Sequence, residues 1–135
     1  TLAFLGNIPD ESCAPIAKAI ESAVESTRAF DVVIGPGTTL LGRSVLCLPV
    51  RGWGLEQLAE AVRSAALGPD ERGAPERFFG HLTLARSAHR GRIPGELVGR
   101  SLSASWWIGE IHLVRSVAGP DGSSYDSVAV IPLKP

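Results

Sequence analysis

Apolar residues recur along the chain at two spacings, which predict helices and strands in alternation. Over residues 9–27 they recur three and four positions apart, which is typical of an amphipathic helix. Asp10 or Ser12 is expected to cap this helix, with Pro15 in its first turn. A similar stripe over residues 54–68 predicts a second helix, and residues 94–102 a short third one.

Runs rich in β-branched and aromatic residues predict the strands. They cover residues 1–6, 30–35, 44–50, 78–86, 105–116 and 123–133. A Gly- and Thr-rich connection over residues 35–42 indicates that its two flanking strands pair antiparallel, and the turn GPDG joins the last two strands. Because strands outnumber helices and several connections look antiparallel, the pattern favours an α+β fold over a doubly wound parallel sheet.

One short sequence occurs twice. Thr1-Leu2-Ala3 recurs at residues 83–85, each time inside a predicted strand. A helix and a pair of strands follow each copy. This order of elements suggests a duplicated architecture with two lobes.

Composition narrows the class of protein. The chain has 135 residues, enough for a single domain, and its formal net charge is −1. This charge argues against a basic surface that binds long nucleic acid, but it leaves room for a pocket that holds one phosphate. We see no 18-residue apolar run and no signal peptide, so we expect a cytoplasmic protein. Cys13 and Cys47 have no metal-type spacing and are expected to be small buried side chains in a reducing compartment.

The segment FFGHLTLAR, residues 78–86, carries the candidate chemistry. Alternation along a strand places His81 and Thr83 on one face, about 7 Å apart, and Leu82 and Leu84 on the other, where they can be buried. A histidine can transfer a proton near neutral pH, and a threonine hydroxyl can donate to an anionic oxygen. Arg86 can pair with a phosphate, but strict alternation would send it to the opposite face unless a bulge or the strand end turned it back.

From these residues alone, a half-exposed strand that happens to carry His81 and Thr83 is the more frequent explanation. The surrounding sequence changes that weighing. Residues 78–86, together with TLAFLGNIPDE at residues 1–11, resemble the 2H phosphoesterase superfamily, which is named for two His-x-Thr-x motifs. Within it, the chain is most similar to the RNA 2′,3′-cyclic phosphodiesterases, also called 2′-5′ RNA ligase-like proteins.

The resemblance runs along essentially the whole chain in the right order. That family's second motif is Pro-His-x-Thr-Leu-Ala-Arg, and this chain has Gly80 in place of the proline. A late segment, residues 110–133, resembles the end of the family's fold. The resemblance implies two lobes whose antiparallel sheets flank a central cleft, with helices packed outside.

The resemblance also implies roles for individual residues. His81 would be the proton acceptor, Thr83 and Thr1 would bind the phosphate, Arg86 would add positive charge, and Phe78 would lie near the base. Thr1 matches the threonine of the first motif, whose histidine, the proton donor, would lie two positions earlier. We therefore expect residues 1–135 to form one domain that lacks its N-terminal strand, helix and first-motif histidine.

The implied reaction is hydrolysis of RNA 2′,3′-cyclic phosphate ends to 2′-phosphates, reversible as 2′-5′ ligation. It needs no metal and no cofactor, and the substrates would be RNA ends or cyclic nucleotides. We expect a monomer that does not interact with membranes. The alternative is a nucleotide- or RNA-binding module that keeps the fold and has lost turnover; an unrelated α+β domain with a chance motif ranks last.

Other polar and aromatic residues have plainer explanations. His112 shares a predicted face with Glu110 and is interpreted as a structural histidine. The basic segment around His89 is interpreted as a solvated loop, with contact to an RNA backbone as the alternative. Of Trp106 and Trp107, which are adjacent, one is expected in the core and the other over the sheet or against a base.

Overall fold

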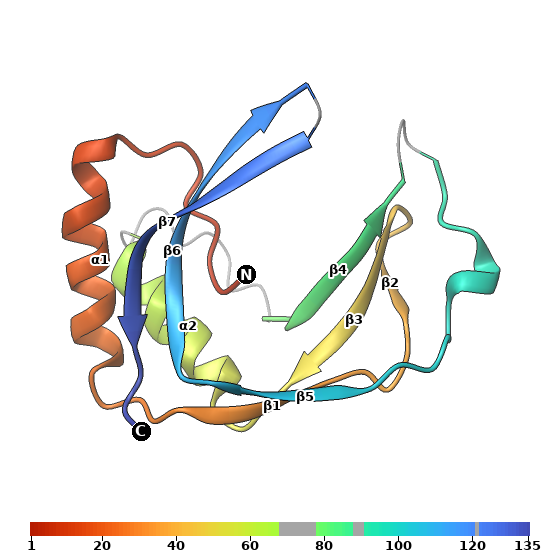
Figure 1. Cartoon of the computed structure of the whole chain (residues 1–135), viewed down its shortest axis with the longest axis horizontal. Coiled ribbons are helices and arrows are strands. Elements are labelled where there is room, and N and C mark those ends of the chain that lie inside the picture. Colours follow the sequence, from red (N-terminus) through yellow and green to blue (C-terminus); the bar gives the residue numbers. More distant parts are fainter. Residues whose placement is uncertain (68–77, 88–90, 121) are drawn as a thin grey trace. The chain divides into compact units, whose positions relative to one another are not determined.

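The structure is a computed structural model that describes residues 1–67, 78–87, 91–120 and 122–135, and it divides into two compact units (Figure 1). The first unit is formed by Thr1, Phe30–Glu56 and the described residues from 78 to 107. The second is formed by Leu2–Ala29, by residues 57–67, which include most of the second helix, and by Ile108–Pro135. The α+β class is confirmed, with two α-helices and two separate sheets among the described residues.

The first unit is built on one sheet of five strands. They are β1 (Phe30–Ile34), β2 (Thr39–Leu41), β3 (Val45–Arg51), β4 (His81–Arg86) and β5 (Ala104–Ile108). Strand β3 is central: β4 pairs with one edge, and β1 and β2 share the other, all antiparallel. Strand β5 continues the sheet beyond β1. The expected antiparallel pairing of residues 30–35 with 44–50 is therefore confirmed, and the connection between them adds a strand of its own.

The core of this sheet lies along β3. Its residues are buried on both faces from Val45 to Pro49, which fits an apolar run without alternation. In β1 burial alternates, with Val32 and Ile34 inside. The helix α2 (Leu55–Ala66) buries three side chains at helical spacing, namely Leu58, Ala59 and Val62.

The second unit pairs a helix with a hairpin. The hairpin consists of β6 (Glu110–Gly119) and β7 (Gly122–Pro132), antiparallel along their length, and α1 (Asp10–Val24) lies along β7 (Figure 1). Ile20 and Val24 of α1 are buried, as is Ile131 of β7. Burial of these apolar side chains, rather than surface charge, is what stabilises the helix on the strands.

Three predicted elements differ in the structure. Residues 1–6 form no strand, because a strand requires a hydrogen-bonded partner and here the Leu2 carbonyl instead accepts from Arg63 Nε at 3.1 Å. The expected helix over residues 94–102 is only a 3-10 turn, Gly95–Leu97. Thr38 holds the segment at the end of this turn and just after it. Its hydroxyl donates to the Leu97 carbonyl and accepts from the Arg100 N–H.

The single strand predicted over residues 105–116 is two strands. It breaks at Gly109, so that β5 belongs to the first sheet and β6 to the hairpin.

Helix α1 begins at Asp10, which places Pro15 in its second turn and not its first. Because Pro15 has no N–H, the Glu11 carbonyl has no intrahelical donor. Glu11 is exposed near the start of the helix, so water can hydrogen-bond to its carbonyl instead. No described helix has the length and apolar content that crossing a membrane requires.

Candidate functional site

The candidate site lies on β4, and its geometry follows from the pairing of β4 with β3. Along β3 every residue from Val45 to Pro49 has a partner, but β4 uses one residue more. Leu84 has no partner, because the register shifts between Leu46 and Cys47. Strand β4 therefore carries a β-bulge at Leu84. The aligned pairs are His81 with Pro49, Leu82 with Leu48, Thr83 with Cys47, Ala85 with Leu46, and Arg86 with Val45.

This bulge decides where Arg86 lies. Residues paired across an antiparallel ladder share a face of the sheet, and alternate residues of a regular strand do so too. Val45, Cys47 and Pro49 are alternate residues of β3, so their partners share a face. Those partners are Arg86, Thr83 and His81. The shared face of His81 and Thr83 is confirmed, and the bulge supplies the change of direction that strict alternation denied to Arg86.

The tautomer of His81 follows from its hydrogen bond. Its Nδ1 lies 2.8 Å from the carbonyl oxygen of Phe79. A carbonyl oxygen can only accept, so Nδ1 carries the proton, and Nε2 of the neutral ring keeps its lone pair. The bond also fixes the ring orientation. His81 is thus arranged to accept a proton at Nε2.

Phe79 lies against the histidine and was not singled out from the sequence. Its ring stacks on that of His81, with centroids 5.7 Å apart and planes 15° from parallel. About two-fifths of Phe79 is exposed, 43%. Its spacing of two residues from His81 was the available signal, because such residues share a face of a strand. Phe78, the residue matched to the base, is half-buried and makes contacts of its own.

The residue beside Thr83 on the neighbouring strand is a cysteine, Cys47. Cys47 is fully buried, and burial raises the pKa of its thiol. The thiol therefore stays protonated at neutral pH and is a poor nucleophile. Cys13 is partly exposed, so the expectation of buried cysteines is confirmed for Cys47 and wrong for Cys13; both are free.

Gly80 sets the distance between β4 and β3 just before the histidine. Its carbonyl accepts from the Val50 N–H at 2.8 Å. A Cβ atom at this position would lie 2.5 Å from the Val50 carbonyl oxygen and 3.0 Å from Leu55 Cδ2. Glycine is therefore required by a close approach of two backbones, a constraint that only the tertiary structure reveals.

The opposite side of β4 is less buried than alternation suggested. Leu82 is 42% exposed and Leu84 45% exposed, so the expectation that both can be buried is wrong. Leu82 pairs with Leu48, which is almost fully buried. On this face other side chains therefore cover β3 but leave the neighbouring β4 partly exposed.

The two tryptophans also differ from expectation. Neither Trp106 nor Trp107 is in the core, because β5 is the last strand of the sheet and leaves both exposed.

The remaining predicted residues contribute less to the geometry. Thr1 is exposed, in a segment without regular structure, and its role as the partner of Thr83 stays a prediction. His89 and Arg90 lie outside the described residues. In the described part of the chain Arg86 makes no ion pair. Histidine, cysteine and carboxylate side chains form no cluster able to hold a metal ion among those same residues.

Comparison with solved structures identifies the architecture. TT0787 of Thermus thermophilus matches with a TM-score of 0.77 and 24% sequence identity, over 99% of this chain and 76% of that one. E. coli LigT in its apo form matches with a TM-score of 0.72 and 25% identity, over 100% of this chain and 75% of LigT. The fold is that of LigT. LigT in complex with NADP+ gives a TM-score of 0.69 at 26% identity, over 100% and 75% of the two chains.

The two comparisons by sequence gave no match, whereas solved structures gave several. No family model matches the sequence, and no curated protein matches it either. A further structure on the LigT fold, described as a phosphoesterase, matches with a TM-score of 0.67 at 25% identity, over 100% of this chain and 76% of its own. LigT has been crystallised with 3′-AMP, with phosphate and with ATP.

Proposed function

We propose that this chain is part of a phosphoesterase that acts on RNA, and that it hydrolyses 2′,3′-cyclic phosphate ends to 2′-phosphates. The observation that carries the proposal is the common face of His81, Thr83 and Arg86, which Arg86 joins because of the bulge in β4. A proton acceptor, a hydroxyl donor and a fixed cation then meet one phosphate from the same side. The LigT fold and the resemblance in residues 78–86 support the same chemistry.

In the proposed reaction His81 Nε2 takes a proton from the water that attacks phosphorus. The bond between phosphorus and the 3′-oxygen breaks, and a second histidine protonates that oxygen. Thr83 and Arg86 stabilise the charge that develops on the non-bridging oxygens, as Thr1 would from the first motif. Each proton transfer contributes typically about 10²- to 10⁴-fold to the rate.

The remaining parts of the proposal come from the resemblance. The second histidine lies two positions before Thr1, and the same site can run in reverse as a 2′-5′ ligase. The proposed enzyme uses neither metal nor cofactor, acts as a monomer in the cytoplasm, and takes RNA ends or cyclic nucleotides as substrates. Phe78 remains the proposed neighbour of the base, and Phe79 joins it because it stacks on the catalytic ring.

Replacing His81 tests the proposal. His81→Ala and His81→Asn, each in a protein that also carries the residues preceding Thr1, are expected to lose roughly 10²- to 10⁴-fold in hydrolysis of a 2′,3′-cyclic nucleotide, because the proton acceptor is gone. Leu82→Ala is the matched control, since that side chain lies on the opposite face of β4. Product analysis should show the 2′-phosphate. Near wild-type turnover in both His81 variants would refute the assignment.

The same experiment separates the enzyme from its rival, a binding module without turnover. Binding of 3′-AMP is measured by calorimetry alongside hydrolysis. An enzyme shows turnover that falls in the His81 variants, whereas the rival binds the nucleotide and turns over nothing in the unmodified protein. LigT binds 3′-AMP, which makes this ligand a suitable probe.

A further inference from the structure

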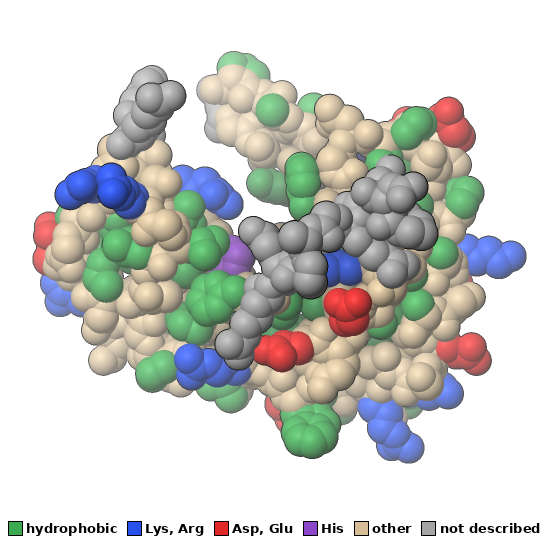
Figure 2. Space-filling model, turned by 180° about the vertical axis from the view of Figure 1, so that it is seen from behind, with side chains coloured by type: hydrophobic (Ala, Val, Ile, Leu, Met, Phe, Trp, Pro, Cys, Tyr) green, Lys and Arg blue, Asp and Glu red, His purple; other side chains and the backbone are tan. Residues whose placement is uncertain are grey.

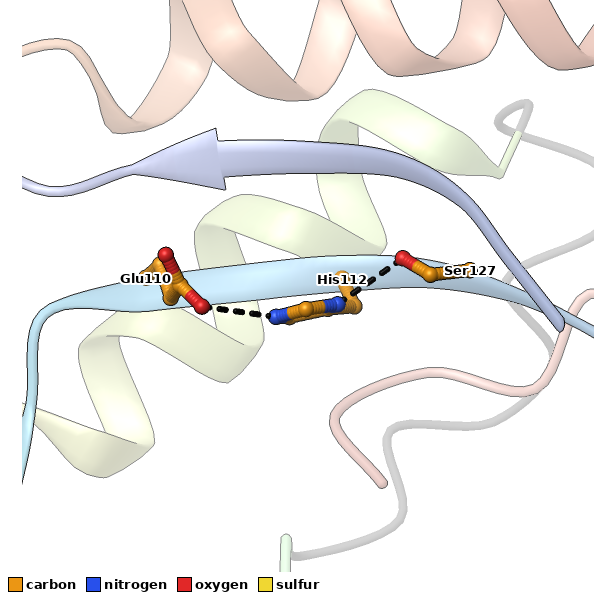
Figure 3. Close-up of polar contacts among 3 residues, drawn as sticks. All are labelled: Glu110, His112 and Ser127. Atoms are coloured by element: carbon orange, nitrogen blue, oxygen red, sulfur yellow. Dashed lines mark hydrogen bonds and ion pairs between the residues drawn. The ribbon is translucent and has the colours of Figure 1, made fainter. Parts of the chain in front are cut away.

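A second group of reactive side chains lies on the β6–β7 hairpin, in the other unit. His112 stands between Glu110, two residues before it on β6, and Ser127 on β7 (Figure 3). Its Nδ1 lies 2.8 Å from Ser127 Oγ, and its Nε2 lies 3.0 Å from Glu110 Oε1. The expected shared face of His112 and Glu110 is therefore confirmed, but the histidine is 39% exposed and not buried.

The acceptors in this group fix the direction of its hydrogen bonds. A carboxylate only accepts, so His112 Nε2 carries a proton and donates it to Glu110. Nδ1 of the neutral ring then holds a lone pair and accepts from the Ser127 hydroxyl. This is the arrangement of roles in a serine–histidine–acid triad, with the two ring nitrogens exchanged. It makes the Ser127 oxygen the nucleophilic end of the group.

The backbone beside Ser127 is irregular in a way that suits this chemistry. In the ladder Leu113 pairs with Ala129 and Val114 with Ser127, so Val128 is an extra residue without a partner on β6. The N–H of the residue that follows a nucleophilic serine is a recurrent donor to an oxyanion. Val128 follows Ser127 directly and has no partner on β6, so its N–H is the one that would take this role.

The group is accessible. Residues of β6 on the opposite face are the half-buried ones, and Arg115 on that face bonds Asp10 of α1, with Nη2 and Oδ1 2.6 Å apart. Helix α1 thus packs behind the hairpin, while Ser127 on the front is exposed. Val114 and Val130 flank it and are about half exposed, which offers apolar contact to a small substituent.

We propose that Ser127 is a nucleophile that accepts acyl groups from small, activated carboxylic esters. Its Oγ forms a bond to the carbonyl carbon while its proton passes to His112 Nδ1, and Glu110 holds the imidazolium that results. The ester bond breaks, and the leaving alcohol takes the proton from Nδ1. Water then attacks the acyl-serine, its proton passes through His112 back to Ser127 Oγ, and a carboxylic acid is released. The proposal does not depend on the phosphoesterase assignment.

The experiment follows acylation of Ser127 directly. The protein is made with His81→Ala, which removes the imidazole of the candidate site on β4, and is treated with p-nitrophenyl acetate and, separately, with an alkyl fluorophosphonate. Release of nitrophenol is followed by stopped flow, and the modified residue is located by peptide mass spectrometry. We expect an initial burst and one label, on Ser127.

Three further variants decide the outcome. Ser127→Ala should abolish the label, and His112→Gln should slow labelling by on the order of 10²-fold, the lower end of the contribution of a general base. Ser116→Ala is the control: Ser116 lies on the same face, opposite Tyr125, and has no histidine beside it. Labelling of Ser127 no faster than of Ser116, or as fast with His112→Gln as without it, overturns the proposal. Circular dichroism confirms that each variant is folded.

Discussion

At the scale of single residues, the site depends on where three side chains point. His81 and Thr83 share a face by simple alternation, and this could be predicted from sequence. Arg86 joins them only because Leu84 is left out of the ladder. Nothing in the string HLTLAR marks Leu84 as the bulged residue, since its identity depends on the register against β3.

Arg86 offers the prediction at this scale. Arg86→Gln should lower kcat/KM for a 2′,3′-cyclic mononucleotide roughly 10- to 100-fold, because a hydrogen bond to a charged group contributes about 1.5–3 kcal/mol. Arg86→Lys should recover part of the loss, since it keeps the charge but not the planar geometry. Steady-state kinetics at constant salt measure both.

Arg43→Gln is the control for Arg86, because Arg43 is an exposed arginine in the turn that precedes β3, outside the ladder. Equal kinetics for Arg86→Gln and Arg43→Gln would mean that Arg86 does not meet the phosphate.

At the scale of elements, the strands hold the site and their spacing is set by backbone contacts. Strand β4 enters the sheet beside β3 through Gly80, whose carbonyl bonds Val50. The resemblance placed a proline where this chain has glycine, and sequence alone gave that difference no meaning. The structure does, because any Cβ atom there meets the Val50 carbonyl.

Gly80→Ala is therefore expected to destabilise the protein and displace His81. Overpacking of this kind costs typically about 1–3 kcal/mol, measurable as a change in the free energy of unfolding in urea. Hydrolysis should fall as well, because the strand carrying His81 moves. Gly95→Ala is the matched control, since a Cβ atom at Gly95 meets nothing within 4 Å. If both variants were equally stable, the close approach at Gly80 would not constrain β4.

At the scale of the whole molecule, charge limits what the protein can bind. The net charge is −1, and positive and negative side chains are interspersed on the face drawn in Figure 2. Such a surface does not attract long nucleic acid by its overall field. Contact with an RNA backbone would have to come from a local group, and the candidates in the sequence are Arg90 and Arg92.

Arg90→Ala combined with Arg92→Ala is expected to weaken binding of an oligonucleotide more than binding of 3′-AMP. The dependence of the binding constant on salt should also fall, by roughly 0.7 in log–log slope for each phosphate that the protein no longer neutralises. Fluorescence titration at several salt concentrations measures both effects. Lys18→Ala with Arg28→Ala is the control and removes equal charge from exposed positions in the second unit. Equal weakening for both ligands would identify residues 87–92 as an ordinary solvated loop.

The sequence by itself determined the two helices, most of the strands and the candidate strand. These features are local, because burial of one face imposes a period of 3.6 residues on a helix and 2 on a strand. The motif in residues 78–86 also had a local signature. Prediction from sequence was wrong where hydrogen bonds between distant segments decide the structure. Residues 1–6 were predicted as a strand but form none, and residues 105–116 were predicted as one strand but belong to two.

Tertiary structure alone decided the arrangement of the reactive groups. The register of β4 on β3 placed Arg86 on the same face as His81, and the register of β7 on β6 brought Ser127 to His112 from 15 residues away. In both cases one strand has an extra residue, and where it falls depends on both strands together. The segment FFGHLTLAR contains the side chains proposed to act on a phosphate, and its register against β3 determined that they lie on one face of the sheet.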